Sequence, residues 1–226
     1  MPKWPAALAT KSLAAITFAV VAASPQPTHA QVAWPDRPLK LIVPYPAGGN
    51  ADNTARLLAT QLSSRLGQQV VVDNRPGGSG TIGAAAVAKA APDGYTLLLD
   101  ATAFTVNPSL LPKMPFDAAK DFAPISLVMQ APLLLVVPTA SPLKSVADLT
   151  QAARAKPGHL TYASAGNGGA QHLAGELFKQ GARVSITHIP YRGGAPALAD
   201  LIGGQVDLMF SATTASGPFV KSGKLR

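Results

Sequence analysis

A glycine-rich loop, residues 44–49, lies between a short apolar run and a stretch with leucines at helical spacing, and it is the first candidate site. The apolar run has the length of a buried strand, and the prolines that follow cannot continue a sheet ladder. Gly48 and Gly49 allow a tight turn and a close approach of the backbone to a ligand. Asn50 or Asp52 could cap the helix that follows. This first loop therefore predicts an anion site made of backbone N–H groups.

A second glycine-rich loop, residues 164–169, repeats this pattern in the other half of the chain. Ser164 and Asn167 can donate or accept hydrogen bonds, and the glycines among these residues expose backbone amides. Each helix end contributes roughly 0.3–1 kcal/mol to anion binding, and each hydrogen bond to a charged group contributes about 1.5–3 kcal/mol. Two such loops predict a cleft in which two helix N-termini grip one anion. Ordinary strand-to-helix turns are the alternative.

The segment Gly78–Gly83 matches the G-x-G-x-x-G pattern of dinucleotide-binding loops, and Asp100 follows it at the end of a strand-like segment. That pattern places its glycines at the strand-to-helix turn itself. Here residues 73–77 separate the preceding strand-like segment from Gly78. A dinucleotide-dependent enzyme that uses this loop is therefore the alternative function.

Other kinds of site have weaker support in the sequence. Ser164 matches the nucleophile motif G-x-S-x-G only in part, because Tyr162 occupies the place of its first glycine. The histidines show no metal-ligand spacing and the chain has no cysteine, so we predict no metal and no cofactor. His172 falls in the first turns of a helix, where it could contact a ligand or be structural. Tyr191 and Arg192 could form a third wall of the site, with Arg192 either a charge partner or solvated.

The charge pattern argues against a nucleic-acid partner. The formal net charge is +8 over 226 residues, but the basic residues are scattered and few aromatic residues stand between them. A nucleic-acid-binding surface would cluster its basic residues. A mild positive field that attracts small anions is the simpler interpretation.

Residues 1–30 have the three parts of an export signal. Lys3 and Lys11 precede the apolar segment Leu13–Ala23, and Thr28–Ala30 provides a small-residue cleavage site. The apolar segment is shorter than the roughly 20 residues that span a bilayer. We therefore expect removal of residues 1–30 and export, and the predicted location is a bacterial periplasm.

The elements that must position the two loops alternate between strand and helix. In the first half, strands are predicted at 39–43, 69–72 and 95–99, and helices after residue 50 and at 81–91. This order predicts a parallel, buried sheet, and the helix after residue 50 is expected to carry Leu57, Leu58 and Leu62 on one side. Between residues 101 and 124 the periodicity fades among four prolines, which predicts a crossover into a second domain.

The second half is again predicted to be α/β. Strands are expected at 125–129, 133–137, 160–163, 184–189 and 206–210, and helices at 146–155, 169–181 and 195–202. The predicted organisation is thus a signal peptide at 1–30, a first domain at 31–102, and a second domain at 103–226 that includes the start of a return crossover. A further strand is expected at the end of the chain, and the first sheet is expected to be incomplete.

Short motifs spread through the chain resemble the Bug-type receptors of tripartite tricarboxylate transporters. They run in order from Trp34 to the end of the chain: Pro44–Gly49, Asp52, Ala55–Arg56, Asn74–Gly77, Ala91–Thr96, Asn107–Leu110, Lys120–Phe122, Tyr162–Gly168, His172–Leu173, His188–Tyr191 and Gly203–Asp207. An ordered set of this kind is specific for the family.

The resemblance implies a two-domain α/β flytrap fold of periplasmic binding proteins, with parallel-rich sheets and with its C-terminal part apparently missing. It implies a non-enzymatic, monomeric receptor that binds a small organic carboxylate and delivers it to the subunits of a cognate membrane permease. Two residues depart from the family pattern. Gly169 stands where relatives often carry a hydroxyl residue, and Ser211 where an acidic residue is common.

The predicted ligand-binding residues combine the two loops with positions near them. They are Tyr45, Ala47, Gly48, Gly49, Asp52, Thr102, Ser164, Ala165, Gly166, Asn167, Gly168, Gly169, His172 and Tyr191.

Overall fold

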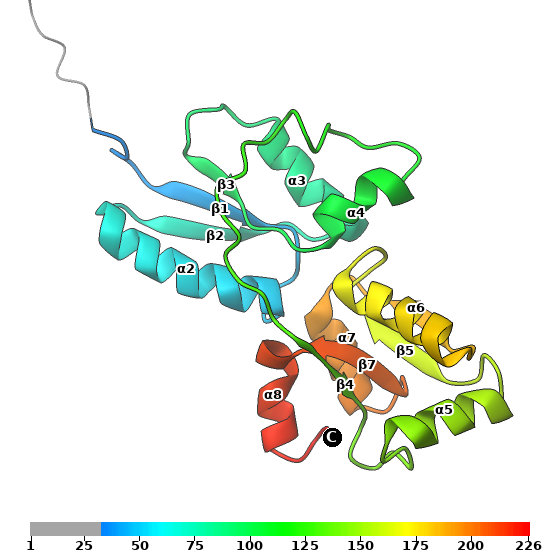
Figure 1. Ribbon diagram of the computed structural model, residues 1–226. Helices are drawn as coiled ribbons and strands as arrows, with labels where there is room; N and C mark the ends of the chain where they lie inside the picture. The colour runs from blue at the N-terminus through cyan, green and yellow to red at the C-terminus, as the bar shows by residue number, and fades with distance from the viewer. Residues whose placement is uncertain (1–32) are drawn as a thin grey trace, which may run out of the picture. The chain divides into compact units, whose positions relative to one another are not determined.

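The structure is a computed structural model that describes residues 33–226 (Figure 1). The predicted signal peptide at 1–30 lies outside these residues. None of the helices in the described part of the chain is long and apolar enough to cross a membrane.

The first sheet is parallel, as predicted. Its strands are β1 (Leu39–Val43), β2 (Val70–Asn74) and β3 (Thr96–Leu98), in the order β2-β1-β3. The helices that connect them are α2 (Asn50–Leu66) and α3 (Thr81–Ala88), and a short 3₁₀ turn, η1 (Gly78–Gly80), precedes α3. In Figure 1, α2 runs along β2 and β1.

The face of β1 that meets α2 forms the core of this half. Leu39, Leu41 and Val43 are buried against Ala55 and Ala59 of α2. Successive residues of a strand point to opposite faces, and here these alternate apolar residues all meet one helix. This packing brings the first loop to the start of α2.

Two details of α2 differ from the prediction. Its N-cap is Gly49, with an extended backbone, and not Asn50 or Asp52. Leu58 and Leu62 pack on the core as expected, but Leu57 is 72% exposed. An α-helix turns about 100° per residue, and this turn places Leu57 outside the face that Leu58 and Leu62 present to the sheet.

The predicted crossover contains a helix that was not predicted, α4 (Ala103–Leu110), in spite of Pro108 within it. The rings of Phe104, Phe116 and Phe122 pack together here, with centroids 5.0–5.9 Å apart. This aromatic cluster joins residues that are distant in the sequence, and local periodicity therefore could not reveal it. The helix was therefore not predicted, because tertiary packing stabilises it.

The predicted strand at 125–129 is also wrong. These residues form no strand, and Ile125 and Leu127 are 82% and 73% exposed. No strand within residues 33–226 pairs with this segment. An apolar run forms a strand only where another strand satisfies its backbone groups.

The second sheet is mixed. Its strands are β4 (Leu133–Val136), β5 (Thr161–Ser164), β6 (Thr187–Pro190) and β7 (Leu208–Ala212), in the order β4-β7-β5-β6. Only β4 is antiparallel to its neighbour. The helices are α5 (Val146–Ala155), α6 (Ala170–Ala182), α7 (Gly194–Ile202) and α8 (Thr213–Lys221). The bounds of α5 are those predicted, whereas the three strands after it begin one to three residues later than expected.

Helices cover both faces of the second sheet. Buried residues of α7 pack with Met209 and Ala163 on one face, and Leu149 of α5 packs with Tyr162 and Leu208 on the other. The last residues of the chain extend the pairing, because Arg226 exchanges two backbone hydrogen bonds of 2.9 Å with Val137. The helix α8 was not predicted, since Pro218 lies within it. The domain boundary between residues 102 and 103 stays a prediction.

Candidate functional site

A cavity of about 200 Å³ collects loops from both halves of the sequence. Its lining comes from the loop after β1, from the turn before α3, and from the loops after β5 and β6: Pro44, Tyr45, Gly77, Gly78, Ser79, Gly80, Ala165, Gly166, Asn167, Pro190, Tyr191 and Arg192. Among these described lining residues, Arg192 is the one charged side chain. The cavity is therefore mildly electropositive and largely walled by backbone.

The predicted ligand-binding residues divide into two sets. Five of them line the cavity: Tyr45, Ala165, Gly166, Asn167 and Tyr191. The others do not appear in its lining: Ala47, Gly48, Gly49, Asp52, Thr102, Ser164, Gly168, Gly169 and His172. Whether either set contacts a ligand stays a prediction.

The first loop is tied to the protein by Asp52, which is only 2% exposed. Its carboxylate accepts hydrogen bonds from Gly48 N (2.9 Å), Arg56 Nε (3.0 Å) and Asn74 Nδ2 (2.9 Å). Burial acts to raise the pKa of Asp52, but these hydrogen bonds outweigh burial and hold the pKa below its usual value. The Gly48 amide is therefore already paired with a buried anion, and the first loop lies against Gly194 at the start of α7.

The glycines of the second loop are also bonded internally. Gly166 N donates to Ser164 Oγ (3.1 Å), Gly168 N to His172 Nδ1 (3.1 Å), and Gly169 N to the Gly166 carbonyl (3.4 Å). The sequence predicts that these amides are exposed, but the structure pairs Gly166 and Gly169 within the loop and Gly168 with His172 of α6. Within residues 33–226, the cavity-lining amides of Ala165 and Asn167 have no hydrogen-bond acceptor.

The turn at Gly77–Gly80, which also lines the cavity, was missed as a binding element, because its glycines suggested a dinucleotide loop instead. Ser79 has a left-handed backbone (φ 52°), and its carbonyl accepts a 2.9 Å hydrogen bond from the buried Asn107 side chain. A Cβ added at Gly166 would lie 3.4 Å from Ser79 Oγ, so the turn faces the second loop. The cluster of glycines around Ser79 was the signal that could have placed this turn in the site.

One oxygen of the Asp100 carboxylate is occupied by two protein donors. Its Oδ1 accepts hydrogen bonds from Tyr45 Oη (2.9 Å) and Ala101 N (2.7 Å). Burial raises the pKa of Asp100 to about 6. Burial next to this carboxylate also raises the pKa of Tyr45. A dinucleotide loop needs such an acid free to bind ribose, and the observed bonds argue against that alternative.

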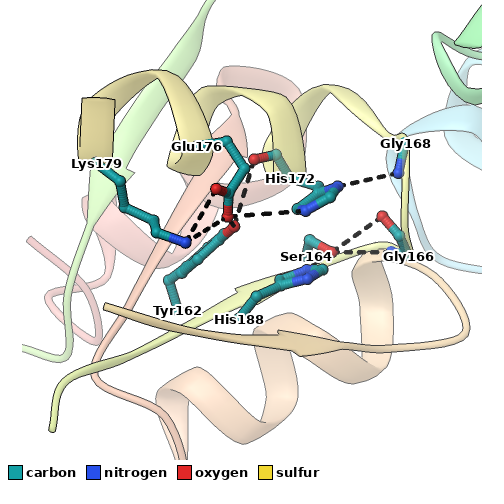
Figure 2. Close-up of polar contacts among 8 residues, drawn as sticks. All are labelled: Tyr162, Ser164, Gly166, Gly168, His172, Glu176, Lys179 and His188. Carbon is teal, nitrogen blue, oxygen red and sulfur yellow. Dashed lines mark hydrogen bonds and ion pairs between the residues drawn. The ribbon is translucent and has the colours of Figure 1, made fainter. Parts of the chain in front are cut away.

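A polar network lies beneath the second loop (Figure 2). Ser164 Oγ is 2.6 Å from His188 Nε2, and Ser164 is fully buried. The His188 ring stacks on Tyr162 at 4.8 Å and on His172 at 4.1 Å between centroids. Burial, followed by the proximity of His172, lowers the pKa of His188 to about 4. Ser164 is thus a buried partner of a neutral histidine.

Glu176 of α6 completes this network. Its Oε1 accepts hydrogen bonds from Tyr162 Oη (2.7 Å) and Lys179 Nζ (2.8 Å), and it lies 3.9 Å from His172 Nε2. Burial acts to raise the pKa of Glu176, but the bonds from Lys179 and Tyr162 outweigh it and lower the pKa. Within residues 33–226, no group of three or more acidic or histidine side chains could hold a metal ion.

The neutral His188 should make stability depend on pH. Its folded pKa lies below its ordinary value of 6.5, so its contribution to folding is present above about pH 6.5 and is lost as the pH falls towards about 4. Asp100 acts in the opposite sense, because its raised pKa favours the folded state at low pH. We therefore expect urea unfolding to show a smaller loss of stability between pH 7 and pH 5 in His188→Gln than in the wild type.

A second histidine provides the matched control for this measurement. His159 is exposed, so His159→Gln should keep the pH dependence of the wild type. If His188→Gln and the wild type lose the same free energy of unfolding over this range, His188 is not held neutral by the fold.

Comparison with known proteins identifies relatives over most of the chain. The family model "Tripartite tricarboxylate transporter family receptor" matches residues 54–226. A solved R. palustris structure with adipate is 42% identical, with a TM-score of 0.83, and matches 85% of this chain and 65% of its own. The structure of the periplasmic binding protein BugD is 39% identical, with a TM-score of 0.81, and matches 85% of this chain and 64% of its own.

A third solved structure carries another carboxylate. MatC from Rhodopseudomonas palustris with bound malate is 32% identical, with a TM-score of 0.77, and matches 85% of this chain and 66% of its own. In these three comparisons the chain thus spans about two thirds of the length of each relative.

Proposed function

Because the chain belongs to the receptor family of tripartite tricarboxylate transporters, we propose that it binds a small organic carboxylate in the cavity described above. Its fold is the α/β periplasmic-binding-protein fold with parallel-rich sheets, as the resemblance predicted. The receptor acts by binding and carries out no reaction. The ligand would be delivered to the subunits of a membrane permease.

The positive charge and the free hydrogen-bond donors of the cavity wall are the main support for this proposal. Arg192 supplies one positive charge, and the amides of Ala165 and Asn167 supply donors that have no acceptor within the described residues. Ser79 adds a hydroxyl on the opposite wall. A hydrogen bond to a charged group contributes about 1.5–3 kcal/mol, so a few of them can reach the roughly 8 kcal/mol of a micromolar complex after the cost of association.

The bound forms of two relatives support a carboxylate as the ligand. One relative was solved with adipate and another with malate, and both ligands are dicarboxylates. A cavity of about 200 Å³ suits a molecule of this size better than a dinucleotide. We therefore place a short dicarboxylate first among the candidates.

The location and the remaining partners belong to the same proposal. The export signal predicted at 1–30, together with a family that includes the periplasmic binding protein BugD, supports a periplasmic receptor. We propose that it works as a monomer without a metal, a cofactor or a nucleic-acid partner.

Thermal unfolding in the presence of a ligand panel tests the proposal. We expect adipate or malate to raise the melting temperature, because a ligand at a hundred times its dissociation constant stabilises by about 2.7 kcal/mol. The uncharged diamide of adipic acid should have no effect, since it lacks the charge that Arg192 would bind. Stabilisation by NAD and by none of the carboxylates would overturn the proposal in favour of a dinucleotide enzyme.

Arginine variants locate the binding site in the same assay. Arg192→Gln should weaken dicarboxylate binding by about tenfold, or about 1.4 kcal/mol, as expected for the loss of one partly exposed charge partner. Arg65→Gln is the matched control, because Arg65 is exposed in the last turn of α2 and does not line the cavity. Equal affinities in the two variants would place the anion elsewhere.

A further inference from the structure

The two glycine-rich loops end in the same hydrogen-bonded cap, built with different chemistry. In α2 the N-cap is Gly49, and Asp52, three residues later, accepts a hydrogen bond from Gly48 N at 2.9 Å. In α6 the N-cap is Gly169, and the residue three positions later is His172. Its Nδ1 accepts a hydrogen bond from Gly168 N at 3.1 Å. Both are variants of the capping box, in which the third helical residue reaches back to an amide before the helix.

The difference between the two caps is that an imidazole accepts this hydrogen bond only when the nitrogen carries no proton. A carboxylate with three donors keeps its charge down to acidic pH, as Asp52 does. Histidine changes its charge between pH 5 and pH 8. A protonated Nδ1 would point an N–H at the Gly168 N–H and break the cap of the second loop. The first loop would keep its cap.

The ring of His172 stacks directly on the ring of His188. The rings of His172 and His188 lie 4.1 Å apart and nearly parallel, at 13°. A cation on one ring therefore faces the other ring directly. Glu176 lies 3.9 Å from His172 Nε2, but its carboxylate is already shared by Lys179 Nζ and Tyr162 Oη. These are the charged and titratable side chains that contact the stack from β5, α6 and β6 (Figure 2).

The conformation of the second loop decides the shape of the cavity. Ala165, Gly166 and Asn167 line the cavity and are followed directly by Gly168, whose amide His172 holds. At its other end, the loop is held by Ser164, which bonds Gly166 N and His188 Nε2. The anchor at Gly168 thus depends on a neutral imidazole.

We propose that His172 is a positioning residue whose neutral imidazole holds the second loop in its binding conformation, and that protonation of His172 at Nδ1 releases the loop and weakens ligand binding. The ligand part of this inference rests on the proposed carboxylate-binding function. The conformational part concerns the protein alone.

The test compares His172→Asn and His172→Leu with the wild type in the full chain. Asparagine places Oδ1 close to the position of Nδ1, so it keeps an acceptor for Gly168 N but does not titrate. Leucine removes the acceptor. His159→Asn is the matched control, since this exposed histidine lies outside the loop and the stack. Hydrogen exchange of the Gly168 amide, measured by NMR without ligand, reports the cap directly.

For the free protein, we expect exchange protection of Gly168 to decrease from pH 8 to pH 5.5 in the wild type and in His159→Asn, after correction for intrinsic exchange. His172→Asn should keep its protection at both values, and His172→Leu should have lost it at pH 8. Wild-type protection of Gly168 in folded His172→Leu would overturn the proposal, and so would wild-type pH dependence in His172→Asn.

Adipate affinity supplies the second readout. We expect the wild type to lose about tenfold more affinity than His172→Asn over the same pH range. This loss corresponds to about one hydrogen bond from the released loop to the charged ligand. Protonation of adipate itself weakens binding to both proteins equally, so the comparison with His172→Asn removes this contribution. Equal losses in the two proteins would overturn the link to binding. If neither protein binds any carboxylate at pH 8, the proposed function fails, whereas the exchange result for Gly168 still decides the conformational part.

Discussion

Valine in place of Gly166 is expected to weaken dicarboxylate binding by at least about a hundredfold, or about 2.7 kcal/mol. Gly166 lines the cavity with φ of +130°, a backbone conformation that a β-branched residue resists. An added Cβ would lie 3.4 Å from Ser79 Oγ and 3.5 Å from the Tyr191 carbonyl, so the rest of the valine side chain would fill the space between the walls. Calorimetric titration of the folded variant with adipate measures the loss.

Gly204→Val separates the effect on the site from the effect of backbone strain. Gly204 also has a positive φ, +71°, but an added Cβ would meet no atom within 4 Å, and the residue does not line the cavity. Strain of this kind costs of order 1–3 kcal/mol of stability. Gly204→Val should therefore lose stability and keep its affinity. If the two variants bind adipate equally well, the cavity is not the binding site.

Alanine in place of Gly175 is expected to destabilise the protein by about 1–3 kcal/mol, although alanine favours a helix over glycine by about 1 kcal/mol. An added Cβ would lie 2.2 Å from Cε2 of the buried Tyr162 ring. The ring cannot shift away from the added Cβ without loss of these contacts, because it stacks on His188 and its hydroxyl donates to Glu176 at 2.7 Å. Urea unfolding measures the change.

Gly181 lies in the same helix and supplies a control with the opposite expected sign. An added Cβ there would meet no atom within 4 Å. Gly181→Ala should therefore stabilise the protein by up to about 1 kcal/mol, because it lowers the conformational entropy of the unfolded chain. Stabilisation by both substitutions would show that the Tyr162 ring is free to move and that the network beneath the second loop is loosely packed.

Elements bounded by local signals could be predicted from the sequence alone. The strand β1 is an apolar run ended by Pro44, and α5 follows Ser145, whose hydroxyl accepts a hydrogen bond from Asp148 N at 3.1 Å. Run length, proline and caps act within a few residues. The alternation of strand and helix was sufficient to predict a parallel first sheet, and the ordered motifs were sufficient to predict the family.

Elements that depend on distant partners could not be predicted in this way. The helix α4 tolerates Pro108 because the ring of Phe104 packs with two rings from the segment that follows the helix. The apolar residues at 125–129 form no strand, because no strand in the described part of the chain pairs with them. Periodicity describes one segment at a time, whereas packing and strand pairing join several.

The sequence by itself thus determined that glycine-rich loops follow two strands and precede two helices, because turns and helix starts are encoded by neighbouring residues. Only the tertiary structure decided what lies against these loops. It places Asn74 on Asp52, stacks His172 on His188, and brings the turn around Ser79 to face Gly166. These partners and the cavity walls depend on where the chain folds back on itself, and short-range patterns carry no information about that.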